Sequence, residues 1–185
     1  MGVGEMTLSS TIAQQANLER VPEGVAVPAE TFRYRMEDRP VCWLTGMVGS
    51  GPHANGGEWV RELWTRFLER ADELPEGLDR SVFVSPCHGR ETEFTCYLGF
   101  AGESPVPASD LPDGFVSILI PAHRYGVATV SGDQADVTAV YGDLPRWIEG
   151  QGAATDREIL WLELYRERPR PIGERIDLEI WLPLR

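Results

Sequence analysis

The stretch Ile159-Leu160-Trp161-Leu162-Glu163-Leu164-Tyr165 is the most informative part of this 185-residue chain. Its leucines alternate with bulkier or charged residues, and side chains of a β-strand point alternately to the two faces of a sheet. The pattern therefore predicts a strand with a leucine core on one face. On the other face, the carboxylate of Glu163 would lie between two aromatic rings.

A second alternating stretch follows at the end of the chain. Ile176, Leu178, Ile180 and Leu182 would form one face of this strand, and Asp177, Glu179 and Trp181 the other. The segment between the two strands is rich in Arg and Pro and is expected to be a hairpin. Its arginines (Arg166, Arg168, Arg170 and Arg175) fit a solvated turn better than an anion or partner contact.

The remaining elements are predicted from apolar spacing and from turn residues. Further strands are expected at 32–36, 41–48, 82–86, 93–100, 115–120 and 125–130, and a loop at 49–57. The clearest helix is 58–74, whose apolar face holds Trp59, Leu63, Trp64, Phe67, Leu68 and Ala71. A weaker helix is expected at 136–150, interrupted by Gly142 and Pro145.

The order strand-helix-strand-strand occurs twice, over about 31–101 and 115–185. Trp43 and Val127 are 84 residues apart, as are Tyr97 and Trp181, and each pair would occupy equivalent places in the two halves. We therefore predict an α+β fold, a duplicated β-α-β-β unit with antiparallel sheets and helices on one side. A ligand cleft is expected between the halves. Residues 1–30 are expected to form an N-terminal arm or extension.

The composition is strongly acidic, with 29 acidic against 17 basic residues and a formal net charge of -12. Such a field repels phosphate backbones, so we expect no direct binding to nucleic acid. The first thirty residues contain no sustained apolar stretch and no run approaches a membrane span, so we expect a cytoplasmic protein without membrane contact. The three cysteines (Cys42, Cys87 and Cys96) show no framework spacing, and we expect free thiols in a reducing compartment.

Metal and cofactor sites are not predicted. His53, His88 and His123 are scattered, whereas zinc needs three or four ligands at defined spacings. The glycine-rich segment 46–57 has no phosphate-binding lysine and is expected to be a loop or lid.

The aromatic residues around Glu163 suggest a site for a planar, hydrophobic and often cationic ligand, since stacking and cation-π contacts would supply affinity and the carboxylate selectivity. Burial would raise the pKa of that carboxyl group. The alternative is a solvated outer sheet face, and the strand pattern alone does not decide between them. The candidate ligand-binding residues are Trp43, Trp64, Tyr97, Tyr125, Trp161, Glu163, Tyr165 and Trp181.

From about Thr31 to Arg185 the chain resembles the GyrI-like family, which is similar to the effector-binding domains of AraC-type and MerR-type regulators. The resemblance rests on the order of several short motifs. These are Arg39-Pro40 before Trp43-Leu44-Thr45-Gly46, Glu62-Leu63-Trp64, Tyr97-Leu98-Gly99, Ile120-Pro121-Ala122-His123-Arg124-Tyr125, Leu162-Glu163-Leu164-Tyr165 and a final Ile-Trp-Leu-Pro-Leu strand. It implies that Glu163 lies in a drug-binding pocket. The helix around Gly142 and Pro145 departs from the family pattern.

The resemblance implies three modes of action: a sensor fused to a DNA-binding module, a stand-alone binder of drugs or protein partners, and a hydrolase that opens the cyclopropane ring of DNA-alkylating natural products. Thirty leading residues are too few for a helix-turn-helix, so we favour a stand-alone binder, as a monomer or homodimer. In the hydrolase alternative Glu163 would deprotonate water, and Tyr97 or Tyr165 would donate to the developing oxyanion. A protein-binding inhibitor with an acidic surface is the third possibility.

Overall fold

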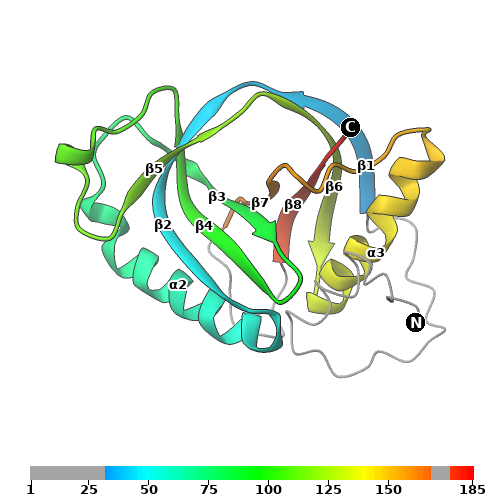
Figure 1. Ribbon diagram of the computed structural model, residues 1–185, viewed down its shortest axis with the longest axis horizontal. Helices are drawn as coiled ribbons and strands as arrows, with labels where there is room; N and C mark the ends of the chain where they lie inside the picture. Colours follow the sequence, from blue (N-terminus) through cyan, green and yellow to red (C-terminus); the bar gives the residue numbers. More distant parts are fainter. Residues whose placement is uncertain (1–31, 168–175) are drawn as a thin grey trace.

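A computed structural model describes residues 32–167 and 176–185, within which eight strands and two α-helices are found (Figure 1). The strands are β1 (Phe32–Arg39), β2 (Cys42–Pro52), β3 (Asp79–Gly89), β4 (Glu93–Gly102), β5 (Val116–Ile120), β6 (His123–Gly132), β7 (Trp161–Tyr165) and β8 (Ile176–Pro183). The helices are α2 (Gly56–Arg70) and α3 (Gln134–Gly150). The predicted N-terminal arm and most of the predicted 166–175 hairpin lie outside the described residues.

The predicted α+β class is confirmed, with each predicted strand and helix present in the expected order. Two local predictions are wrong. The first half of the loop expected at 49–57 is strand, because β2 continues to Pro52 in its pairing with β4. The helix expected to be interrupted at Pro145 is continuous, with the proline inside it.

All eight strands form one sheet in the order β1-β6-β8-β7-β3-β4-β2-β5, where two sheets were a possible arrangement. The order is symmetric about the β7–β3 pair, since β7-β8-β6 on one side matches β3-β4-β2 on the other. Each edge strand pairs with the opposite half: β1 lies beside β6, and β5 beside β2. All the ladders are antiparallel, so the strand-helix-strand-strand duplication produces a continuous sheet.

The ladder register corrects one equivalence expected from sequence spacing. Tyr97 stands opposite Val48 in the β2–β4 ladder, and Trp181 stands opposite Val127 in the β6–β8 ladder. If Tyr97 and Trp181 are equivalent, the counterpart of Val127 is therefore Val48 and not Trp43. Hydrogen-bond pairing sets this register, and equal separation along the chain does not reveal it.

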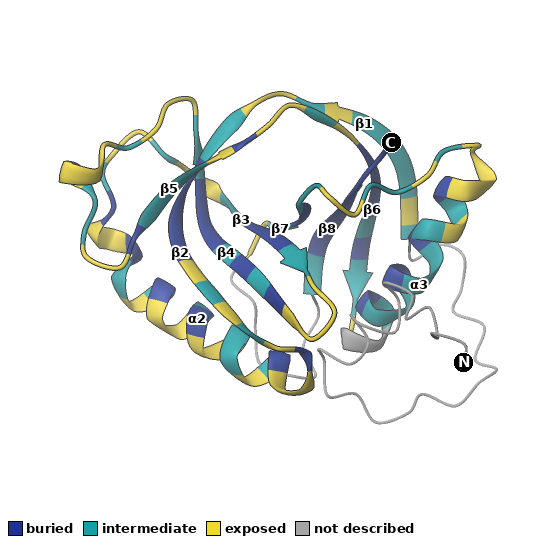
Figure 2. Cartoon of the chain, viewed as in Figure 1, coloured by how far each residue is buried: buried dark blue, intermediate teal, exposed yellow. Residues whose placement is uncertain are grey.

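The buried hydrophobic residues form two cores, one on each face of the sheet. Figure 2 shows the buried residues along the central strands and on parts of both helices. The face under the two helices carries the larger core, which includes Leu63 and Phe67 of α2 and Leu144 and Ile148 of α3. A smaller core on the other face is built entirely from strands. It consists of Leu44, Val84, Ile120, Tyr125, Val127, Leu162 and Trp181. Each fully buried large apolar side chain contributes about 1.5–3 kcal/mol.

Cys87 and Cys96 stand directly opposite each other in the β3–β4 ladder and form a disulfide, with their Cα atoms 4.3 Å apart. The expectation of three free thiols is therefore wrong for this pair. The two cysteines are nine residues apart, and only the hairpin register brings them face to face. Cys42 is a free, partly exposed thiol.

Candidate functional site

Glu163 lies on β7, one of the two central strands of the sheet, on the face that carries the helices. Helix α2 packs along β2 and β4, whereas α3 packs along β6 and β8. In Figure 1 the two helices lie on opposite sides of the central strands β3, β7 and β8. The Glu163 carboxylate therefore occupies the middle of the sheet, between the two helices.

Two tyrosine hydroxyls donate hydrogen bonds to the Glu163 carboxylate. Tyr141, which comes from α3, donates to Oε1, and Tyr165, two residues further along β7, donates to Oε2 at 2.7 Å. Each oxygen of this carboxylate therefore accepts one phenolic hydrogen bond.

Burial determines the protonation behaviour of this network. Loss of hydration raises the pKa of Glu163, and the hydrogen bonds from Tyr141 and Tyr165 oppose that rise without cancelling it. Burial and the neighbouring carboxylate raise the pKa of both phenols well above their ordinary value. Both tyrosines consequently remain protonated donors at every physiological pH.

No arginine among the described residues lies within ion-pair distance of Glu163, although this carboxylate is surrounded by protein. The residue nevertheless keeps some solvent exposure, as does Tyr165. Glu163 is thus a negative group with no cationic partner among the described residues.

Aromatic rings lie around Tyr165, one of the two donors to Glu163. Trp64 of α2 contacts Tyr165 edge-on with ring centroids 5.1 Å apart, and it contacts Phe83 of β3 at 5.5 Å. Phe83 stands directly opposite Tyr165 in the β3–β7 ladder, and Trp161 belongs to the same core. These rings offer apolar faces and edges to a planar molecule.

Four of the predicted site residues are brought together here: Trp64, Trp161, Glu163 and Tyr165. Three others lie on the opposite face of the sheet. Leu162 is paired with Trp181, and Glu163 with Ile180, so Trp181 points away from the carboxylate. Tyr125 and Tyr97 pack in the same strand-built core as Trp181. Trp43 lies on β2, separated from β7 by β3 and β4.

The prediction that Tyr97 and Trp181 share the Glu163 face is therefore wrong for this structure. The physical cause is the register between β7 and β8. The alternation predicts correctly which residues share a face within each strand, but the face with Trp181 lies beside Leu162 and not beside Glu163. Tyr165 is the only one of the two proposed oxyanion donors that reaches Glu163 among the described residues.

Sequence reasoning missed two polar residues of the site. Tyr141 occupies the inner face of α3, and its spacing from Val137, Leu144 and Ile148 could have placed it there. Ser85 stands directly opposite Glu163 in the β3–β7 ladder and is buried. No pattern in the sequence indicates that Ser85 stands opposite Glu163, because this position depends on the pairing of two strands about eighty residues apart.

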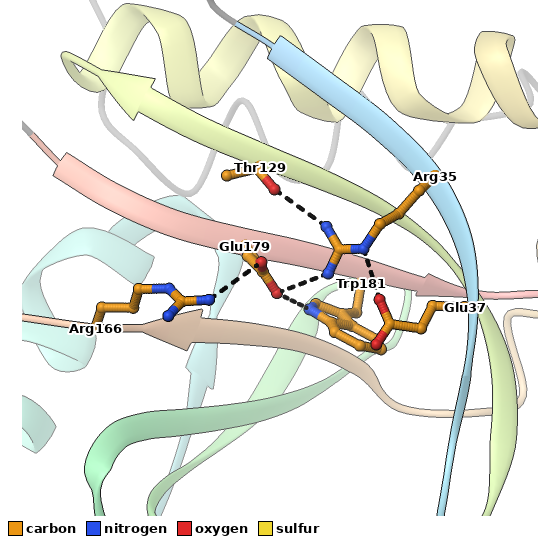
Figure 3. Close-up of polar contacts among 6 residues, drawn as sticks. All are labelled: Arg35, Glu37, Thr129, Arg166, Glu179 and Trp181. Carbon is orange, nitrogen blue, oxygen red and sulfur yellow. Dashed lines mark hydrogen bonds and ion pairs between the residues drawn. The ribbon is translucent and has the colours of Figure 1, made fainter.

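A second buried carboxylate on the opposite face provides a contrast (Figure 3). Glu179 accepts hydrogen bonds from Arg35 and from the Trp181 indole, both at 3.1 Å, and lies 3.7 Å from Arg166. Arg35 also donates to Glu37 and to Thr129, and so links β1, β6 and β8. Glu179 is thus neutralised within the protein, whereas Glu163 is not.

Comparison with known proteins defines the family. The model of Cass2, described as an integron-associated effector binding protein, matches residues 35–184. This chain belongs to the Cass2 family. Cass2 is related to the GyrI-like domains, so the resemblance seen in the sequence is confirmed, and the chain is an effector-binding domain.

The Cass2-family chain is 25% identical over 154 residues to the transcriptional regulator BrlR of Pseudomonas aeruginosa. The match covers 81% of this chain but 54% of BrlR, so the chain spans about half the length of this curated relative. Among solved structures, SAV2435 bound to tetraphenylphosphonium superposes with a TM-score of 0.61 at 15% identity, covering 83% of this chain and 94% of that one. A hydrolase from Listeria innocua gives a TM-score of 0.52 at 10% identity, covering 83% and 92%. These likenesses show the fold.

Two other properties of the Cass2-family chain bear on its chemistry. Within residues 32–167 and 176–185, no three His, Cys, Asp or Glu side chains come together as metal ligands. No helix in this part of the chain is both long and apolar enough to cross a bilayer.

Proposed function

We propose that this chain binds a planar, hydrophobic cation in a recess at Glu163, between α2 and α3, with Glu163 as the counter-ion. The observation that carries the proposal is the buried Glu163 carboxylate, which has two tyrosine donors and no arginine partner among the described residues. An uncompensated buried charge is unfavourable. A cationic ligand would supply the missing charge, and the surrounding rings would add stacking and cation-π contacts.

The solved relative SAV2435 is described as bound to tetraphenylphosphonium, a lipophilic cation with four phenyl rings. That compound supports a hydrophobic, aromatic cation as the proposed ligand, with its separate phenyl rings as the planar groups. The acidic surface of this chain, with a formal net charge of -12, would favour the approach of a cation as well.

Hydrolysis of a cyclopropane-bearing electrophile is the second candidate, because a fold relative is described as a hydrolase. In that reaction Glu163 would deprotonate a water molecule and a tyrosine hydroxyl would donate to the developing oxyanion. Both carboxylate oxygens already accept a phenolic hydrogen bond. These two hydrogen bonds stabilise the ionised carboxylate and so weaken it as a general base, and the arrangement therefore favours binding over turnover.

Isothermal titration of the full chain with tetraphenylphosphonium tests the proposal, with neutral triphenylphosphine oxide as the comparison ligand. We expect the cation to bind and E163Q to lose at least tenfold in affinity, about 1.4 kcal/mol. The matched control is E149Q, which changes an exposed glutamate of α3 and should bind as the wild type does. Equal affinity for the neutral compound, or full binding by E163Q, would show that Glu163 is not the counter-ion.

Mass spectrometry separates the two candidates. A binder returns its ligand unchanged, whereas a hydrolase converts a cyclopropane-bearing alkylating compound to a product heavier by one water. Turnover that disappears in E163Q would favour the hydrolase.

A further inference from the structure

Two arginine side chains lie against the Trp181 ring on the face opposite Glu163, and they differ in how their charges are balanced. The Cζ atoms of Arg35 and Arg39 are each 5.5 Å from the ring centroid. Arg35 is held by Glu37 and Glu179. Arg39 has no acidic partner among the described residues, in a chain with 29 acidic side chains.

Arg39 also has unused hydrogen-bonding capacity. Its Nε is buried and has no hydrogen-bond partner in the described part of the chain. Its Nη2 donates to the Cys42 thiol at 3.6 Å, and sulfur is a weak acceptor. A guanidinium with its Nε and one Nη free of strong acceptors presents the geometry that binds a carboxylate with two parallel hydrogen bonds.

A buried hydroxyl belongs to a ring that lies against the same indole. Tyr125 is fully buried and contacts Trp181 edge-on at 5.7 Å, and its hydroxyl likewise has no hydrogen-bond partner among the described residues. Burial raises the pKa of Tyr125 to about 12, and the nearby charge of Arg39 opposes the rise. The hydroxyl is therefore a donor at physiological pH. Two unsatisfied buried donors on side chains that share one indole neighbour are unfavourable unless an acceptor completes them.

We propose that Arg39 and Tyr125 form a second binding site, which takes the carboxylate of a small organic acid on the sheet face opposite Glu163. The guanidinium and the hydroxyl would both donate to the carboxylate oxygens. One uncompensated arginine matches a single negative charge better than the two charges of a phosphate.

This second site does not depend on the proposed function of the Glu163 recess, because Leu162 and Glu163 face opposite sides of the sheet. Isothermal titration of the full chain with sodium benzoate tests it, at an ionic strength held constant with sodium chloride. We expect benzoate to bind the wild type, R39M to lose at least tenfold in affinity and Y125F to lose about three- to tenfold. R33M changes an exposed arginine of the same strand and should bind as the wild type does.

Two further measurements complete the test. The same R39M protein should still bind tetraphenylphosphonium with wild-type affinity, which shows that it is folded and separates this site from the Glu163 recess. Without benzoate, Y125F should melt at or above the wild-type temperature, because it loses an unsatisfied hydroxyl. Three outcomes would overturn the assignment: no benzoate binding by the wild type, equal binding by R39M, or equal stabilisation by chloride alone.

Discussion

The hydroxyl of Tyr141 on α3 donates a hydrogen bond to Oε1 of Glu163 on β7, and so ties a helix to a central strand of the sheet. Tyr141 is buried and Glu163 is partly buried, so breaking this bond would leave a poorly hydrated polar group at a free-energy cost. This bond makes the position of α3 and the charge of the carboxylate depend on each other.

Replacing Tyr141 by phenylalanine should lower the free energy of unfolding by about 1–3 kcal/mol, because the Glu163 carboxylate would lose one of its two donors. The pKa of Glu163 should rise further in this variant. Urea denaturation measures the first effect. The matched control is Y34F: Tyr34 stacks on Trp147 of the same helix, with centroids 5.6 Å apart, and should lose less than 0.5 kcal/mol. Equal losses in the two variants would refute a special role for the Tyr141 bond.

Stability should fall as pH rises from about 4.3, the ordinary glutamate pKa, through the raised pKa of Glu163. Over this range the folded state binds more protons at Glu163 than the unfolded state, so the slope of unfolding free energy against pH is negative. Cation binding should strengthen with pH over the same range, because the ionised form binds the ligand. Thermal melts from pH 4 to 8 measure the trend. The difference in melting temperature between the wild type and E163Q isolates the contribution of Glu163. A difference that does not vary with pH would contradict the expectation.

Replacing Pro145 by alanine should stabilise the protein by about 1–2 kcal/mol. Pro145 lies inside α3 and has no backbone N–H to donate to the carbonyl of Tyr141, four residues earlier. Alanine would restore that bond and hold Tyr141 more firmly, and it should weaken binding of any ligand that displaces the Tyr141 hydroxyl. Chemical denaturation and ligand titration measure the two effects. The control P105A changes an exposed loop proline and should not stabilise.

Gly46 should not tolerate a side chain. A Cβ atom at this position would lie 1.9 Å from the Leu98 carbonyl oxygen, because Gly46 stands directly opposite Gly99 in the β2–β4 ladder. G46A should therefore lower the free energy of unfolding by about 3 kcal/mol or more. G150A is the matched control, because a Cβ there meets no atom within 4 Å. A G46A variant as stable as G150A in urea denaturation would contradict the close approach.

Reduction of the Cys87–Cys96 disulfide should lower stability by about 2–3 kcal/mol, as expected from chain entropy for a short closed loop. The comparison of denaturation with and without dithiothreitol measures the change. A C42S variant should respond to dithiothreitol in the same way, because Cys42 is free. Mass spectrometry after thiol alkylation counts the free cysteines, and three in the purified native protein would contradict the bond.

Local spacing was sufficient for the elements and for part of the site. The alternation in 159–165 placed Trp161, Glu163 and Tyr165 on one face, and the structure keeps them together on the helix side. The apolar face of 58–74 predicted the helix that carries Trp64, and the repeated element order predicted the duplicated fold. Each of these depends on side-chain periodicity within a single element, which the chain encodes directly.

The relation between elements required the tertiary structure. Whether Trp181 shares the face of Glu163 depends on which residue of β8 stands opposite Leu162, and a shift of one residue in register reverses the answer. Strand register likewise decides that Cys87 faces Cys96 and that Ser85 stands opposite Glu163. Tyr141 reaches the carboxylate because α3 packs over strands of its own half. The sequence by itself determined the strands, the helices and the acid at the centre, whereas long-range pairing and packing decided which side chains that acid meets.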